Sequence, residues 1–324
     1  MAVSVLGVAH ANVNCTSLAA ALPFYRDVLG LTPLIHTAAA PQDGSAFGLA
    51  GDVSWDAWMM TDAGGMASTA IDLLEWRTPA PAGRPYPDPR HLGFSRLRLG
   101  VDDLDRVRWV VGDASCCRDP DGVLLELVAA PTTRLLAVTV GCSDLGYSLA
   151  WYERVLDLDV APGISVDPVV LGLPPETTAD SQLLRPQGQP DAFALELTQW
   201  HGPRARIAPG AWEGVSAGEM GGRERSEPTG THFVGGDPFP PAAHETYPTA
   251  NHVGIYRVAL LVPDAHAAHA ELRRLGVACP PPVFLDLGPE VPIDGVWAVF
   301  FPDPDGACLE LIELPAVTAG AETR

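Results

Sequence analysis

Two carboxylates occupy equivalent positions in a motif that occurs twice in the chain. Asp119-Pro-Asp-Gly precedes an apolar run containing Glu126, and Asp303-Pro-Asp-Gly precedes a similar run containing Glu310. Asp-Pro-Asp-Gly predicts a turn, and the apolar run behind it predicts a buried strand. Apolar residues two positions away on both sides place each glutamate on an inward face, where an unpaired charge would be costly. The sequence therefore predicts a cation beside each glutamate, either a metal ion or an arginine.

A second repeated motif supplies arginines. His-Leu-Gly-Phe-Ser-Arg ends at Arg96 and His-Val-Gly-Ile-Tyr-Arg ends at Arg257, and each is followed by the alternating apolar residues typical of a strand. A guanidinium binds a carboxylate through two parallel hydrogen bonds and keeps it ionised. We expect Arg96 to pair with Glu126 and Arg257 with Glu310. Such a pair could be purely structural, or the arginine could orient an oxyanion, enolate or phenolate of a substrate.

A third repeat predicts the elements that position these residues. The segment 10–31 resembles the segment 137–158, and each copy predicts a strand, an N-cap and a helix. In the first copy Leu18, Leu22 and Tyr25 share one helical face, and the glycine near the end suits a left-handed helix terminus. Each copy therefore predicts a strand followed by an amphipathic helix.

Together the repeats divide the chain into four units of similar design. The units span roughly 1–80, 90–131, 134–202 and 252–316. The interval between Arg96 and the following turn is much shorter than its counterpart after Arg257, which predicts that the second unit has lost a strand. The Gly- and Pro-rich segment 201–251 predicts a long loop, and 317–324 a tail.

The run Phe-Tyr-Arg-Asp-Val-Leu-Gly at 24–30, with the Asp-Pro-Asp-Gly turns and their following glutamates, resembles the vicinal-oxygen-chelate superfamily of glyoxalases, bleomycin-resistance proteins and extradiol dioxygenases. The resemblance covers nearly the whole chain outside 201–250. It implies an α+β fold in which four βαβββ modules pair into two curved eight-stranded cups, each with a site inside. Pairing in chain order gives a first domain at 1–131 and a second at 134–316. Exchange of modules would instead group His10 with Arg257 and Glu310.

In this superfamily the resemblance implies metal ligands at the start of a module's first strand and on its last strand. The corresponding positions here are His10, Arg96, Ala137 and Arg257 on first strands, and Asp72, Glu126, Glu196 and Glu310 on last strands. A second-domain site of Ala137, Arg257 and Glu310 could not bind iron in the expected way, because alanine has no ligand atom and arginine only donates.

The first domain retains a histidine among these positions. His10, Asp72 and Glu126 could hold a divalent metal such as Fe, Mn, Ni or Zn, whereas the second domain is expected to hold none. His10 could alternatively be a general base or a hydrogen-bonded structural histidine. Arg96, Arg257 and the glutamates Glu126 and Glu310 complete the catalytic candidates.

Aromatic residues could line an apolar pocket inside a cup. Trp55 and Trp58 lie on an alternating segment, and Trp76 and Tyr256 could add to the same wall, with Glu196 as a polar contact. The alternative is that these rings belong to the core.

Composition limits the classes of function. Forty acidic residues against 20 basic ones give a net charge of −20, which argues against nucleic acid and anionic membranes as partners. The sequence contains no lysine, which excludes Schiff-base chemistry. The six cysteines form no C-x-x-C pair, so a structural zinc site is not expected. We expect a cytoplasmic monomer or homodimer that binds a small molecule, without a membrane span or signal peptide.

Three functions follow from these residues. The first is an enzyme acting on a small oxygenated substrate, aromatic or a secondary metabolite, by oxyanion-stabilised proton transfer, isomerisation or lyase chemistry, with or without a metal. The second is a ligand-sequestering protein of the bleomycin-resistance kind. The third is a metal-dependent dioxygenase. An enzyme needs an acid and a base that converge on one cavity, whereas a sequestering protein needs an aromatic groove without them.

Overall fold

The computed structural model describes residues 1–112, 115–164, 167–202, 246–291 and 293–315. Most of the predicted loop at 201–251 and the whole predicted tail lie outside these residues. Among the described helices, none combines the length and the apolar character that crossing a membrane would require.

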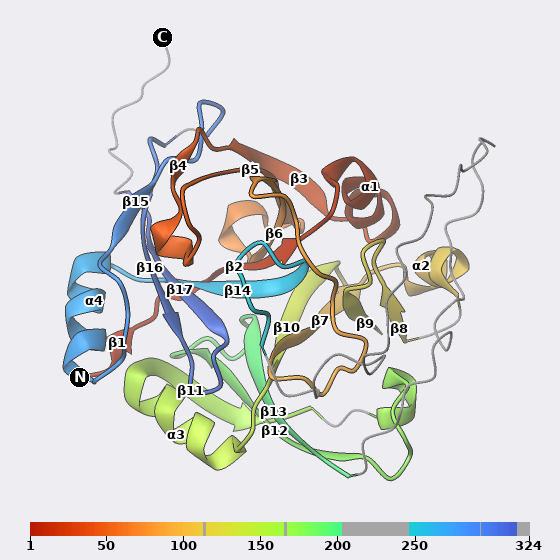
Figure 1. Ribbon diagram of the computed structural model, residues 1–324. Coiled ribbons are helices and arrows are strands. Elements are labelled where there is room, and N and C mark those ends of the chain that lie inside the picture. Colours follow the sequence, from red (N-terminus) through yellow and green to blue (C-terminus); the bar gives the residue numbers. More distant parts are fainter. Residues whose placement is uncertain (113–114, 165–166, 203–245, 292, 316–324) are drawn as a thin grey trace, which may run out of the picture.

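The chain forms two curved sheets with helices packed on their outer faces (Figure 1). The first sheet has eight strands in the order β1-β11-β12-β13-β10-β7-β9-β8. Its strands are β1 (Val3–Ser4), β7 (Gly93–Val101), β8 (Cys116–Arg118), β9 (Leu124–Ala129), β10 (Arg134–Gly141), β11 (Leu156–Pro162), β12 (Thr178–Pro186) and β13 (Ala194–His201).

The second sheet has nine strands, in the order β15-β16-β17-β14-β2-β6-β5-β3, with β4 paired to β5. Its strands are β2 (Gly7–Asn14), β3 (Thr32–Ala38), β4 (Gln42–Asp43), β5 (Asp52–Thr61), β6 (Ala70–Thr78), β14 (Gly254–Leu261), β15 (Val283–Leu285), β16 (Val296–Pro302) and β17 (Cys308–Glu313).

These sheets overturn the assumption that modules pair in chain order. The antiparallel pairing of β2 with β14 joins the first module to the fourth, and that of β7 with β10 joins the second to the third. The cups therefore do not correspond to 1–131 and 134–316: one is built from the second and third modules together with β1, and the other from the first and fourth modules. The chain passes directly from the second module into β10, which pairs with β7, so the second and third modules form one sheet. The first and fourth modules are then left to pair with each other.

The second module is shortened as predicted. It contains β7, the helix α2 (Leu104–Val111), β8 and β9, whereas the fourth contains β14, the helix α4 (Ala265–Arg274), β15, β16 and β17. The first sheet still reaches eight strands, because β1 adds to its opposite edge, where it pairs in parallel with β11.

The helices begin at caps that the sequence provides. Aspartates at the N-caps of α2, α3 (Leu145–Val155) and α4 each accept a hydrogen bond from a backbone N–H of the first turn. The first helix, α1 (Leu18–Pro23), is capped differently, because Glu75 accepts the N–H of Leu18. Its last turn widens into a π-helix at Phe24–Val28, and Gly30 then adopts a positive φ of 82° as expected.

The two Asp-Pro-Asp-Gly turns anchor helices of the neighbouring module. Tyr25 donates a hydrogen bond of 2.8 Å to Asp119, and Tyr152 donates one of 3.0 Å to Asp303. Desolvation by burial raises the pKa of each of these aspartates to about 6, despite the hydrogen bonds that they accept. Helix-to-turn contacts thus join the first module to the second and the third to the fourth, whereas the sheets join the second to the third and the first to the fourth.

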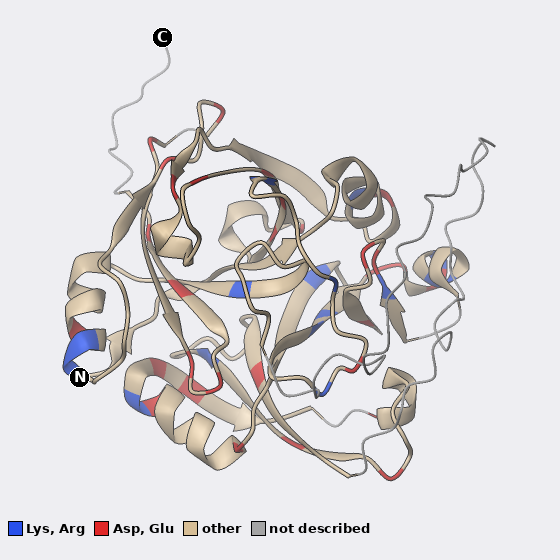
Figure 2. Cartoon of the chain, viewed as in Figure 1, with Lys and Arg blue, Asp and Glu red and all other residues tan. Residues whose placement is uncertain are grey.

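Alternation along the central strands separates the core from the interior of each cup. On β2, Ala11 and Val13 face the main hydrophobic core under the helices, and His10 and Asn12 face the cup. Basic residues lie on the central strands β14 and β7 (Figure 2). These arginines therefore reach the interior from the strands themselves.

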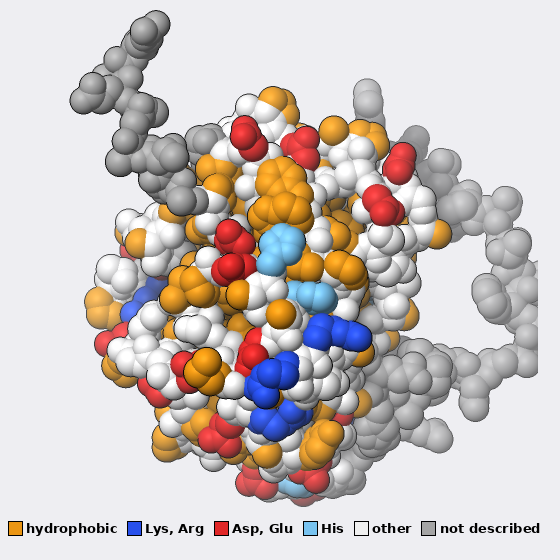
Figure 3. Space-filling view, turned by 90° about the vertical axis from the view of Figure 1, so that its left-hand side faces the viewer, with side chains coloured by type: hydrophobic (Ala, Val, Ile, Leu, Met, Phe, Trp, Pro, Cys, Tyr) orange, Lys and Arg blue, Asp and Glu red, His pale blue; other side chains and the backbone are white. Residues whose placement is uncertain are grey.

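On the face turned toward the viewer in Figure 3, α4 packs on β16, β17 and β1. Hydrophobic, acidic and basic side chains are interspersed there, with Phe284 47% exposed. This mixture gives no single-sign field of the kind that attracts a polyanion or a membrane surface.

Candidate active site

Three charged side chains and a histidine meet inside the cup formed by the first and fourth modules. Arg257 on β14 donates from Nε to Glu310 Oε2 and from Nη2 to Asp72 Oδ2, both at 2.9 Å. His10 Nε2 lies 3.5 Å from the same glutamate oxygen and 3.9 Å from the same aspartate oxygen. We call these four residues the His10 site. Their positions on the four central strands of the sheet make the arrangement rigid.

The guanidinium holds the carboxylate of Glu310 in its ionised form. Burial by itself would raise the pKa of Glu310, but Arg257 and His10 outweigh this effect and lower it. Burial would likewise lower the pKa of Arg257, and the charges of Glu310 and Asp72 raise it instead. Asn12 adds a hydrogen bond of 3.1 Å to Asp72. An ion pair with this much hydrogen bonding offsets the cost of burying its charges.

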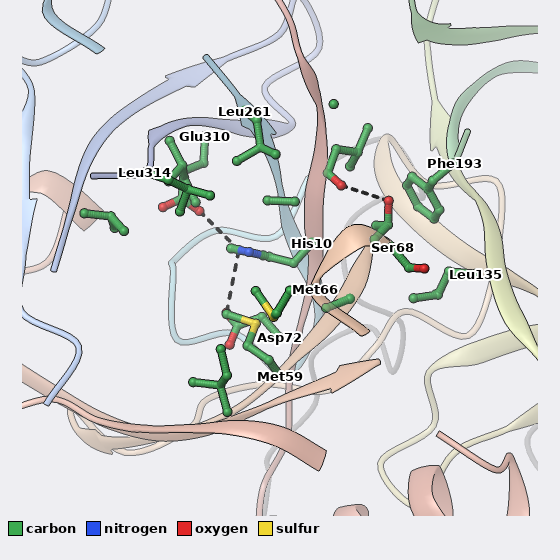
Figure 4. Close-up of a pocket in the computed structure, with 18 of the residues that line it drawn as sticks. His10, Met59, Met66, Ser68, Asp72, Leu135, Phe193, Leu261, Glu310 and Leu314 are labelled. Atoms are coloured by element: carbon green, nitrogen blue, oxygen red, sulfur yellow. Dashed lines mark hydrogen bonds and ion pairs between the residues drawn. The ribbon is translucent and has the colours of Figure 1, made fainter. Parts of the chain in front are cut away.

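A cavity of about 570 Å³ opens above the His10 site, as Figure 4 shows for part of its lining. His10 projects into it between Glu310 and Asp72. Its walls are mostly apolar, and they include Trp55, Trp76, Met59, Phe193, Leu135, Leu261, Leu285 and Ile312. A cavity of this size and composition, with a few polar groups together at one place, is typical of small-molecule sites.

Two nitrogen atoms of the site have no hydrogen-bond partner within the described part of the chain. They are His10 Nε2 and Arg257 Nη1, and both side chains line the cavity. The other guanidinium nitrogens of Arg257 are occupied by Glu310 and Asp72, so Nη1 is the donor left for a ligand. Unpaired buried polar atoms are uncommon in proteins, and at a cavity they indicate a place for a ligand or water.

The His10 site does not fit a divalent metal as it stands. The two carboxylate oxygens nearest His10 are those that Arg257 already binds, and its charge would repel a cation placed among them. No group of three or more His, Cys, Asp or Glu side chains within the described ranges is arranged to hold a metal ion.

The structure does not bring together the predicted metal set of His10, Asp72 and Glu126. Glu126 lies on β9 of the other sheet, where it faces Arg96 and Arg98. The reason is the exchange of modules, which gives His10 the glutamate of the fourth module instead of the second.

The second cup contains an equivalent cluster, which we call the Arg96 site. Arg96 Nη2 donates to Glu196 at 2.8 Å, and its Nε lies 3.4 Å from Glu126. Thr139 occupies the position equivalent to Asn12 and donates to Glu196 at 2.9 Å. In both cups an arginine thus bridges the last-strand carboxylates of two modules, which confirms the expected Arg257–Glu310 and Arg96–Glu126 pairs and adds a second acid to each.

One pair of positions distinguishes the two sites. In the first, His10 lies opposite Ala259 in the β2–β14 register, whereas in the second Ala137 lies opposite Arg98. The small Ala259 leaves space beside His10. Arg98 instead extends beside Glu126, with its Nε 3.6 Å from that carboxylate. The His10 site therefore has an imidazole with open space beside it. The Arg96 site has neither of these and contains a second arginine, Arg98, instead.

The aromatic candidates divide between the cavity and other places. Trp55 and Trp76 line the cavity as predicted. Trp58 does not, because it points to the opposite face of β5 and stacks on His36 at 4.6 Å. Tyr256 packs behind the tryptophans and does not line this cavity, and Glu196 belongs to the Arg96 site.

Sequence reasoning missed Asn12 and Thr139, which support the carboxylates, and Phe193 in the cavity wall. The repeat could have revealed the first two, because each lies two positions beyond the first-strand residues His10 and Ala137. Phe193 carries no signal in the sequence, since it comes from the third module and reaches the cavity only through the tertiary arrangement.

The repeated histidines His91 and His252 have structural contacts. His91 Nδ1 lies 2.8 Å from the carbonyl oxygen of Leu92, and His252 Nε2 lies 2.8 Å from that of Arg84. Burial lowers the pKa of His91 to about 4, so that its ring is neutral at pH 7. Neither histidine lines the main cavity.

No protein-family model and no curated protein matches this chain. Among solved structures, glyoxalase I from Zea mays is similar, with a TM-score of 0.57 and 16% identity over 95% of this chain and 92% of that one. A putative dioxygenase from Bacillus subtilis is similar with a TM-score of 0.52 and 12% identity over 97% of this chain and 87% of that one. The chain therefore has the vicinal-oxygen-chelate fold over nearly its full length, which confirms the fold expected from its motifs.

Proposed function

We propose that this protein is an enzyme that acts on a small oxygenated molecule by proton transfer, with Arg257 taking the electrophilic role for which related sites use a metal ion. The observation that carries the proposal is the Arg257 guanidinium, which bridges Asp72 and Glu310 beside His10 at the base of an apolar cavity. A positioned cation and an imidazole with an unpaired nitrogen are the two parts that enolisation requires.

The arrangement supports the following sequence of events. A substrate carbonyl oxygen accepts a hydrogen bond from Arg257 Nη1. His10 Nε2 removes a proton from the carbon next to that carbonyl, and the electron pair of the C–H bond moves onto the oxygen as an enolate. Where a C=C bond is conjugated with the enolate, it takes the proton back from His10 at the γ-carbon, which shifts the double bond and is an isomerisation. Where the β-carbon carries a leaving group, the enolate expels that group with its bonding electrons, which is an elimination.

The carboxylates act through the groups that they hold. Asp72 and Glu310 each bind one nitrogen of Arg257 and so fix its free nitrogen in one direction. Glu310 also lies 3.5 Å from His10, where it stabilises the imidazolium that forms after proton removal. In this proposal both are positioning residues, because they act through Arg257 and His10 and not on the substrate itself.

A second candidate function is ligand sequestration. Most of the cavity wall is apolar, and its polar groups are confined to a small part of it. This composition favours ligand sequestration. It requires no proton transfer. The enzyme is preferred because His10 faces the cavity together with Arg257. A metal-dependent dioxygenase is disfavoured, because Arg257 already occupies the carboxylates that its metal would need.

Metal content tests the proposal directly. We expect the purified protein to bind well below one equivalent of iron, manganese, nickel or zinc by plasma mass spectrometry, also after incubation with each ion. Arg257→His removes the competing cation and adds an imidazole next to His10, and this variant should gain close to one equivalent. Arg96→His is the matched control, since Ala137 supplies no second imidazole there, and it should gain none. One tightly bound metal ion in the wild-type protein, lost in His10→Ala, would overturn the arginine-based proposal.

Proton transfer is measured separately from binding. Candidate carbonyl ligands that bind the protein are incubated in D₂O, and exchange of the hydrogen next to the carbonyl is followed by NMR. Exchange that disappears in His10→Ala, with binding retained, supports the enzyme. Binding without exchange for every ligand would leave sequestration as the function.

A further inference from the structure

We infer that the cavity above the His10 site accepts a neutral, largely apolar molecule, of aromatic character and with one terminal carbonyl or phenolic oxygen, and that it rejects phosphorylated and other strongly anionic compounds. The inference names the substrate class for the site proposed above, and the role of its oxygen rests on that proposed function. The selectivity for uncharged ligands follows from the cavity alone.

The walls determine the body of the ligand. Trp55 and Trp76 present aromatic surfaces on one side and form an edge-to-face pair with ring centroids 5.9 Å apart. Met59 from the same sheet and Phe193 from the other sheet add a thioether and a further ring. Flat apolar rings gain the most from such surfaces, because aromatic pairs and sulfur–aromatic contacts add to the burial of apolar area.

The charges of the lining exclude an anionic ligand. The described lining has more acidic than basic side chains: Asp62, Asp72, Asp191 and Glu310 against Arg134 and Arg257. Arg257 is already neutralised by two carboxylates, so an added anion would meet an excess of negative charge at the base of the cavity. Phosphate recognition requires several free donors or cations together, and at the base of the cavity Arg257 offers only Nη1 without a partner among the described residues; the other arginine of the lining, Arg134, is exposed to solvent.

The unpaired atoms determine the polar end of the ligand. Arg257 Nη1 can donate to one oxygen, and His10 Nε2 can accept from a hydroxyl or take a proton from an adjacent carbon. A ketone uses the first contact and a phenol uses both. Additional hydroxyl or charged groups would have to face the apolar walls without partners, which is unfavourable.

Three probes that share one ring system test the inference. These are 2-acetylnaphthalene, naphthalene-2-sulfonate and 2-naphthylmethylammonium, titrated into the full-length protein by calorimetry at pH 7. We expect the ketone to bind at least about tenfold more tightly than the sulfonate, because like charges brought together inside a site are strongly unfavourable. Tighter binding of the sulfonate would overturn the inference, and so would tighter binding of the ammonium probe, which would assign the site to cations.

Two variants place the probe in the cavity. Met59→Trp adds volume to the cavity wall and should weaken binding of the ketone by about tenfold or more, since overfilled sites accept a ligand poorly. Leu34→Trp is the matched control, because Leu34 is 46% exposed on β3 and does not line the cavity. Equal affinities in the two variants would show that the ketone binds elsewhere and would refute the assignment.

The outcome is independent of the metal test. A metal ion in the wild-type protein would overturn arginine-based catalysis. It would not change the test of the ligand class, which depends only on the order of the three probe affinities. If the sulfonate bound more tightly than the ketone, the inferred substrate class would be refuted, even if the protein proved free of metal.

Discussion

Replacement of Arg257 by methionine should expose how strongly the fold depends on this one cation. Arg257 is buried and binds two carboxylates that are themselves 3% and 2% exposed. Removing one partner of a buried ion pair costs about 3–5 kcal/mol, because a buried charge is left alone. Two carboxylates lose their partner here, so we expect the free energy of unfolding at pH 7 to fall by about 4–5 kcal/mol.

The loss should depend on pH in a defined direction. In Arg257→Met the folded-state pKa values of the two acids rise above their unfolded values, so protonation stabilises the variant as the pH falls. In the wild-type protein Glu310 has a lowered pKa, so its contribution is present at neutral pH and is lost on acidification. The wild-type loss begins only as the pH falls below the usual glutamate pKa of 4.5, so between pH 7 and pH 5 the stability of the variant changes and the gap between the two proteins should shrink.

Urea unfolding followed by circular dichroism at the two pH values measures the effect. A triple variant that also carries Asp72→Asn and Glu310→Gln serves as control, because it removes every charge of the set and should recover most of the stability. Arg98→Met should cost less than Arg257→Met, since Arg96 still faces Glu126. A loss below about 1 kcal/mol for Arg257→Met, or the same loss at both pH values, would contradict the reasoning.

Two further predictions concern structural contacts away from the site. Tyr25→Phe removes the hydroxyl that donates to Asp119 and should lower the free energy of unfolding by about 1–3 kcal/mol, measured by urea unfolding; an unchanged midpoint would show that the bond contributes nothing. His91 has a folded-state pKa of about 4, below the usual value of 6.5, so it contributes to loss of stability as the pH falls from 6.5 toward 4. His91→Asn should therefore show a smaller fall in urea midpoint between pH 7 and pH 5 than the wild-type protein, and an equal fall would assign the pH dependence to other groups.

Local patterns were sufficient for the modules and their charged positions. The repeats that end at Arg96 and Arg257 predicted inward-facing arginines, and both are buried beside the expected glutamates. The shortened second module was also predicted, from the short interval before its turn. These predictions are correct because alternation along a strand and the residue preferences of turns depend on only a few neighbouring residues.

Module pairing could not be derived in this way. Every module exposes the edge of a similar first strand, so the sequence pattern of β2 is compatible with pairing to β7 or to β14. The structure selects β14, and with it the partner acids of His10. Trp58 and Tyr256 illustrate the same limit at the scale of single residues, because aromatic side chains suit the core and a cavity wall equally well.

The sequence by itself determined that the chain contains four related modules, that each cup carries buried carboxylates, and that arginine is available to neutralise them. The tertiary structure alone decided that His10 shares a cavity with Arg257, Asp72 and Glu310, while Arg98 joins the Arg96 site. The physical reason is that patterns within a strand determine which way a side chain points, whereas its neighbours across the sheet depend on which strands pair, and that choice involves packing over the whole chain.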